Sequence, residues 1–161
     1  MKKLYALIIL AIILSAPLSW AAAPGTCTQA FSEVYGATGP TSLATLTFTC
    51  TASADDASFP ATATSQAITD QIAGRFILEA RTNPGATAPQ ALYDIVLTDT
   101  DGIDLMGGKL GDRSATVSQA APPEIAAGVS WPRPIDGALT HTITGNNVNS
   151  AISVTKYFLS R

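Results

Sequence analysis

Apolar and polar residues alternate along most of this chain, and a period of two predicts β-strands rather than helices. In 41–51, the even-numbered residues from Ala44 to Cys50 are apolar and share one face, whereas a run of threonines lies on the other. In 74–83, we expect Phe76, Leu78 and Ala80 to share a face opposite Ile77. The same alternation predicts strands over 91–99, 138–145 and 151–160, a short return strand over 102–108, and an N-terminal strand that carries Cys27.

Clusters of Gly, Pro, Asn, Asp and Ser separate these strands. The remaining segments are predicted turns (83–90, 146–150), a polar loop or weak strand (53–66), a short helix or irregular edge crossing (109–119), and a proline-rich loop with one short extended piece (120–137). Seven or eight short strands without a long helix are typical of an all-β domain. We therefore predict a single antiparallel β-sandwich or jelly roll over residues 22–161.

Residues 1–21 are predicted to be a cleaved signal peptide. Lys2 and Lys3 form a positive start, an apolar run follows over 4–18, and small residues precede a cut after Ala21. The run is shorter than the ~20 residues of a membrane span, and the residues before Cys27 lack the pattern of a lipid-modified cysteine. We expect export through the inner membrane to the periplasm or the extracellular space, with membrane contact only during export.

Charge excludes one large class of function. Cleavage removes Lys2 and Lys3, so seven basic and twelve acidic residues remain, a net charge of −5. From Ala22 to Gly74 the sequence contains no Lys or Arg. A nucleic-acid partner is not expected, because binding needs basic residues that neutralise phosphates.

Cys27 and Cys50 are the two cysteines of the chain. An even number of cysteines in an oxidising compartment favours a disulfide. A metal site would need more Cys or His ligands, and His141 is the one histidine in the sequence. We therefore predict a Cys27–Cys50 disulfide and no resident metal or cofactor.

An acidic cluster, Asp99, Asp101 and Asp104, surrounds Gly102. The cluster fails the EF-hand pattern, because position 1 of the calcium loop would be Leu and position 12 would be Gly. Asp101-Gly102 instead fits the type I′ turn of a β-hairpin, in which both central residues have positive φ. A weak ion or ligand site at this tip stays open as an alternative.

The other chemistry-bearing residues form no catalytic pattern. His141 lies mid-strand among apolar residues, as a core or edge histidine does, and no nucleophile elbow, phosphate loop or zinc spacing is present. The aromatic residues Trp131, Tyr35, Tyr93 and Tyr157 are candidates for a carbohydrate-stacking platform, although core or strand-edge positions are the commoner use. We expect no enzyme activity.

Two segments, TNPGATAPQALYDIVLTDTDGIDLMGGKLGDRSAT and GALTHTITGNNVNSAISVTKYF, resemble small virion or virion-associated proteins of tailed phages and prophages. The matching features are the Pro84–Pro89 turn, Tyr93-Asp94, the Asp99–Asp104 hairpin, Gly107-Gly108, Asp112-Arg113 and the Asn149–Ala151 turn. The resemblance covers roughly residues 42–159 and implies a non-enzymatic β-sandwich. Residues 27–51 are more weakly similar to the start of secreted pilus-type and spore-coat-type subunits, which close a disulfide onto such a Thr-rich strand.

These features together predict an exported, non-enzymatic structural or interaction protein, stapled by a disulfide, that packs against protein partners or against copies of itself. A virion-associated role is what the phage resemblance implies. The alternatives are a secreted lectin-like module that binds a glycan or an ion, and a pilus-type surface subunit.

Overall fold

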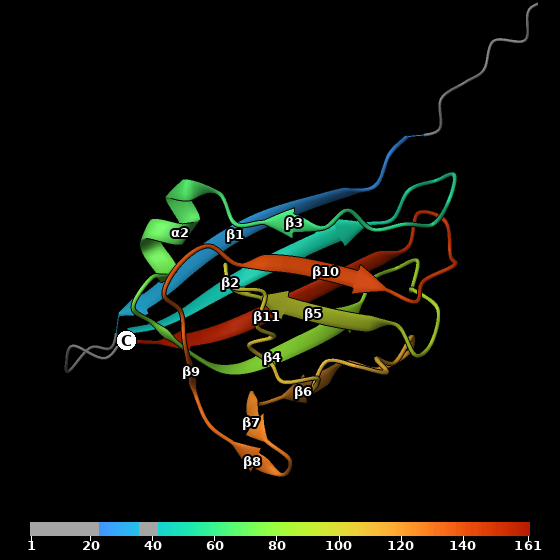
Figure 1. Cartoon of the computed structure of the whole chain (residues 1–161). Coiled ribbons are helices and arrows are strands. Elements are labelled where there is room, and N and C mark those ends of the chain that lie inside the picture. Colours follow the sequence, from blue (N-terminus) through green and yellow to red (C-terminus); the bar gives the residue numbers. More distant parts are fainter. Residues whose placement is uncertain (1–22, 36–41) are drawn as a thin grey trace, which may run out of the picture.

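The computed structural model describes residues 23–35 and 42–161, so the predicted signal peptide over 1–21 lies outside the described residues. Antiparallel strands dominate the fold, and two sheets pack around one hydrophobic core (Figure 1). The all-β sandwich expected from the alternating pattern is confirmed. No helix in these two ranges is long and apolar enough to cross a membrane.

The larger sheet has six strands in the order β1-β2-β11-β4-β6, with β9 also beside β4. Their bounds are β1 Thr26–Tyr35, β2 Ser42–Thr51, β4 Phe76–Pro84, β6 Gln119–Ala121, β9 Arg133–Pro134 and β11 Ile152–Ser160. The last strand of the chain, β11, lies between β2 and β4 and pairs with both. The centre of the sheet is therefore built from distant parts of the sequence.

The smaller sheet covers the inner face of the larger one. It contains β3 (Thr62–Ala63), β10 (Thr140–Thr144) and β5 (Asp94–Thr98), with β10 in the middle. A short helix, α2 (Gln66–Ile72), lies at one end of the sandwich (Figure 1). Ser65 caps it by accepting a hydrogen bond from the Ile68 amide. The sequence pattern missed α2, because seven residues are too few to show a helical period.

The core lies between the two sheets. The even-numbered residues of β2 from Ala44 to Cys50 are buried, as their alternation predicts. His141 from β10 is buried as well, and its ring stacks on Phe48 at 4.5 Å between ring centroids. The ring of Tyr157 from β11 contacts the His141 ring edge-on, with 6.2 Å between the centroids. The core position expected for His141 is thus confirmed, and the histidine joins the two sheets by ring contacts.

The predicted faces of β4 are wrong, because the strand contains a β-bulge. Phe158 pairs with Glu79 but the next residue, Leu159, pairs with Ile77, which leaves Leu78 without a direct partner. The extra residue shifts the alternation, so Ile77 and Ala80 are both buried while Phe76 is exposed. A period of two read through this bulge assigns Ile77 to the wrong side.

The hairpin around Gly102 also differs from its prediction. Gly102 has φ 79°, but Asp101 is not among the residues with positive φ, so the turn is not type I′. The Gly102 amide donates to the Asp99 carbonyl, and the Asp99 amide donates to the Ile103 carbonyl. These bonds fit a three-residue loop with glycine in the left-handed position. The return segment is an isolated bridge between Thr98 and Asp104 followed by turns, rather than a strand over 102–108.

The predicted disulfide joins Cys27 of β1 to Cys50 of β2, which are direct partners in the β1–β2 register. Cys50 is fully buried and Cys27 is partly exposed. The bond ties β1, the edge strand of the larger sheet, to the strand beside it.

Breaking this disulfide should lower the free energy of unfolding by about 3 kcal/mol, because the unfolded chain regains the entropy of a 23-position loop. Denaturant unfolding of the oxidised protein, the reduced protein and the Cys27→Ala/Cys50→Ala double variant measures the loss. The reduced protein and the double variant should agree closely. Equal stability of the oxidised and reduced proteins would contradict this account.

Burial lowers the pKa of His141 from 6.5 to about 3. Between these pH values the unfolded chain binds a proton that the folded protein does not, so stability falls as the pH falls. The slope is at most about 1.4 kcal/mol per pH unit.

The substitution His141→Gln should remove that part of the pH dependence. Urea unfolding of both proteins from pH ~7 to pH ~4 measures it, with the difference between the two curves as the readout. The wild-type protein should lose stability more steeply than the variant. Parallel curves would show that the histidine is not kept neutral by the fold.

Candidate interaction surface

Exposed large apolar side chains mark two features of the surface. Among the described residues, six of the nine such side chains belong to these features: Val34, Leu43, Phe76, Ile125, Val129 and Trp131. Single exposed apolar residues need no explanation, whereas a group of them indicates a contact with another molecule.

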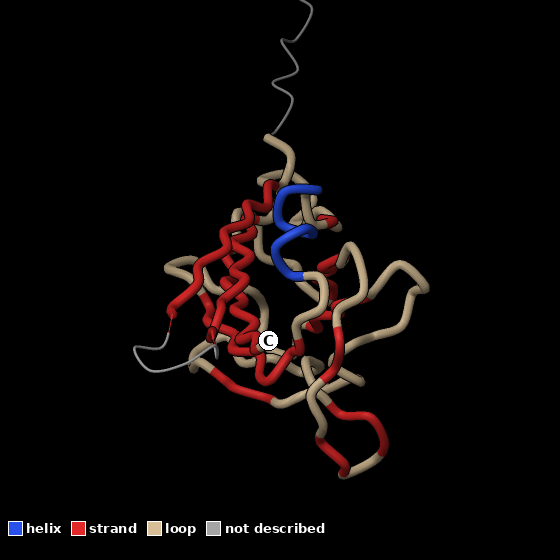
Figure 2. Tube along the Cα trace, turned by 90° about the vertical axis from the view of Figure 1, so that its left-hand side faces the viewer, coloured by secondary structure: helices blue, strands red, loops and turns tan. Residues whose placement is uncertain are grey.

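The first feature is a hairpin that we call the apolar arm, formed by β7 (Glu124–Ala126), β8 (Val129–Ser130) and Trp131. It projects from the sandwich in both views (Figures 1 and 2). The exposed fractions are 48% for Ile125, 49% for Val129 and 65% for Trp131. Three large apolar side chains therefore stand in water on a part of the chain that covers none of the core.

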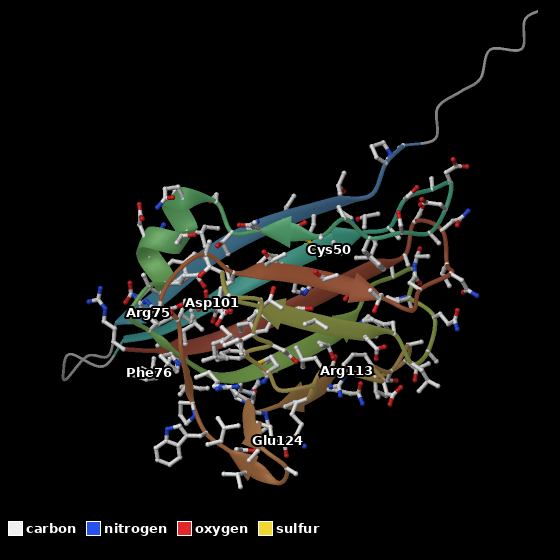
Figure 3. All side chains as sticks on the ribbon, viewed as in Figure 1. Cys50, Arg75, Phe76, Asp101, Arg113 and Glu124 are labelled. Atoms are coloured by element: carbon white, nitrogen blue, oxygen red, sulfur yellow. A yellow bond between two sulfur atoms is a disulfide. The ribbon has the colours of Figure 1, made fainter. Side chains whose placement is uncertain are left out.

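The base of the arm is fixed to the body of the protein. The Glu124 amide donates to the carbonyl of Met106, whose side chain is completely buried. The Glu124 carboxylate accepts a hydrogen bond from the Gly128 amide and lies 3.2 Å from the Lys109 ammonium, and both interactions lower the pKa of this carboxyl. Figure 3 shows Glu124 where the arm meets the sandwich.

Gly107 allows this close approach. Its φ is 62°, and a Cβ atom at this position would lie 2.1 Å from the Glu124 carbonyl oxygen. The neighbouring Gly108 also has a positive φ of 78°, yet nothing lies within 4 Å of its Cβ position. Gly107 therefore allows the arm to sit against the sandwich, whereas Gly108 only allows the chain to adopt a left-handed turn.

The second feature, which we call the apolar row, is a line of four apolar residues and one serine across the outer face of the larger sheet. Register pairs connect Val34 to Leu43, Leu43 to Ser160, Ser160 to Phe76, and Phe76 to Pro134. Three members of this row, Val34, Leu43 and Phe76, are exposed large hydrophobics. Figure 3 places Phe76 at the end of the sheet near the C-terminus. Pro134 lies three residues after Trp131, so the row runs toward the arm.

In the acidic cluster around Gly102, two of the three carboxylates bind backbone amides of their own turn. One oxygen of Asp99 accepts the amides of Asp101 and Ile103, and the two oxygens of Asp104 accept the amides of Met106 and Gly108. These carboxylates hold the turn in shape, while Asp101 is exposed. Within the described ranges, the three carboxylates do not converge on a common point. An ion or ligand site at Asp99, Asp101 and Asp104 stays a prediction.

The disulfide and His141 form the one group of three metal-ligand residues that converges among the described residues. The Cys50 sulfur lies 3.9 Å from His141 Nδ1. Metals bind thiolates, and here both sulfurs are bonded to each other, so the pair offers no thiolate ligand.

The remaining candidates for a site serve the fold. Tyr93 and Tyr157 are buried, so they belong to the core and do not form a stacking platform with exposed Trp131, and the side chain of Tyr35 lies outside those that the structure describes. A hollow of about 370 Å³ lies between the loop 56–61 and residues 142–146. The Asn146 amide group there donates to the carbonyls of Ala57 and Val148, and thereby holds the loop in place.

Comparison of the chain with protein-family models, with curated proteins and with solved structures finds no match.

Gly107→Ala should destabilise the protein more than Gly108→Ala. Both variants carry the cost of a left-handed alanine, about 1 kcal/mol, but only the first also drives a methyl group into the Glu124 carbonyl. Denaturant unfolding gives the two losses, and protease sensitivity at 124–131 reports whether the arm is released. Equal losses in the two variants would contradict the seating of the arm on Gly107.

Proposed function

We propose that this protein is an exported, non-enzymatic structural and interaction protein that docks on a neighbouring protein subunit through the apolar arm. The observation that carries the proposal is a projecting hairpin with three exposed large apolar side chains and a fixed base. A mobile loop would pay ordering entropy on binding, whereas a fixed hairpin is already in its docked shape.

The composition of the arm fits a protein partner. Aromatic residues are enriched at the energetic centre of protein interfaces, and Trp131 is the largest exposed side chain of the arm. The apolar row, which runs toward the arm across β1, β2, β11 and β4, supplies a flatter apolar surface that extends the contact.

Two expectations from the sequence support the same class. The predicted signal peptide and the disulfide are compatible with an exported protein that works outside the cytoplasm. The resemblance to virion-associated β-sandwich proteins favours a subunit that acts by packing against other subunits. A catalytic function has no comparable support, since His141, the one histidine available as a general base, is buried against Phe48 and the disulfide.

The substitution Val129→Thr should weaken association about tenfold, which corresponds to about 1.4 kcal/mol, because it places a hydroxyl in an apolar contact. Trp131→Ser should weaken it further. Sedimentation equilibrium of the purified protein detects association between copies, and cross-linking in the producing cell detects a different subunit.

Val117→Thr is the matched control, since Val117 is 58% exposed but lies outside both the arm and the row. It should leave association and stability unchanged. A protein that is monomeric at every concentration and cross-links to nothing would end the proposal. Equal effects of the Val129 and Val117 substitutions would remove the arm from it.

A further inference from the structure

A second hollow lies on the outer face of the larger sheet and is lined by two cations. Its volume is about 170 Å³, several times the roughly 30 Å³ that a water molecule occupies in the liquid. The lining residues are Arg81, Thr82 and Asn83 of β4, Val154, Lys156 and Phe158 of β11, and Ser118.

The two cations of this hollow lie side by side on neighbouring strands. Arg81 and Lys156 are direct partners in the β4–β11 register, and like charges in that position repel. Glu79 pairs with the Arg81 guanidinium, but Lys156 forms no ion pair within the part of the chain that the structure describes. One carboxylate for two cations leaves a positive charge uncompensated on an acidic protein.

Arg81 is held in place before any ligand arrives. Its guanidinium lies over the Phe158 ring, 4.6 Å from the centroid, and its Nε donates to Glu79. These contacts leave the terminal nitrogens of the guanidinium for another acceptor, since an arginine carries five donors. An arginine fixed in this way loses little entropy when it binds an anion.

Neutral polar groups lie beside the charges. The side chains of Asn83 and Ser118 are exposed and make no hydrogen bond to another described residue. An amide and a hydroxyl match the hydroxyl groups of a sugar, and Val154 supplies an apolar patch for its C–H groups. A bare inorganic anion or an acidic side chain would need only the two cations.

We infer that this hollow binds an acidic sugar residue, a hexuronate of an anionic glycan, with Arg81 and Lys156 on its carboxylate and Asn83 and Ser118 on its hydroxyls. The site lies on different residues from the apolar arm, so it is a function beyond subunit docking. Both cations are solvent-exposed, so binding weakens as salt screens them.

The test titrates the oxidised protein with a galacturonate oligosaccharide and follows backbone amides by NMR. Amides of 81–83 and 154–158 should shift, and a neutral oligosaccharide of equal length should leave them unmoved. Lys156→Gln should weaken binding about tenfold, which corresponds to about 1.4 kcal/mol. Arg161→Gln, which removes the same charge at the C-terminus, should not.

Two further probes separate the alternatives. Asn83→Ala should weaken binding of the oligosaccharide and leave the weak binding of sulfate unchanged. A hexaglutamate peptide that binds as tightly as the oligosaccharide would replace the sugar with an acidic protein partner. No shift at all, or binding that survives Lys156→Gln, would overturn the site, whereas the arm is judged separately by the Val129 variant.

Discussion

The larger sheet depends on the insertion of β11 between β2 and β4. Nine residue pairs join β11 to β2, and a second set joins it to β4 on the other side. Without it, β1–β2 would be an isolated hairpin, and such a hairpin is marginally stable at best in water. The inner face of β11 also carries Tyr157 and Leu159 into the core. The sandwich, the apolar row and the cationic hollow all therefore require the last strand of the chain.

The sequence predicts this fold wherever alternation runs unbroken. Buried residues of β2 and the neighbours of His141 in β10 lie on the faces that a period of two assigns them. The pattern fails at Leu78, because a bulge changes the phase and no residue type announces it. It predicts one short extended piece within 120–137 but not the two-stranded arm, because prolines flank 124–131 and its two strands have only two or three residues each. The disulfide was predictable from compartment and count, whereas the pairing of Arg81 with Lys156 needs the register.

Arg75, just before β4, and Arg81, within it, show how the surroundings of a cation determine what it does. Arg75 is only 2% exposed, and its guanidinium donates to Glu33 at 2.8 Å and to the Gln71 carbonyl. Such a buried charge must be fully partnered, since an unpaired one would cost several kcal/mol. Arg81 is held by Glu79 and Phe158, and Lys156 is its register partner on β11. The first cation ties β1 to α2, and the second is presented to solvent.

The disulfide across β1 and β2 restrains the unpaired edge of the larger sheet. β1 is ten residues long, pairs with no strand on its outer side among the described residues, and contains neither Lys nor Pro. A bare edge of this kind invites strand exchange, in which a strand of one molecule replaces that of another. The covalent bond to Cys50 stops β1 from leaving its own sheet. The bond therefore opposes strand exchange at this edge, and its reduction would leave β1 held by non-covalent contacts alone.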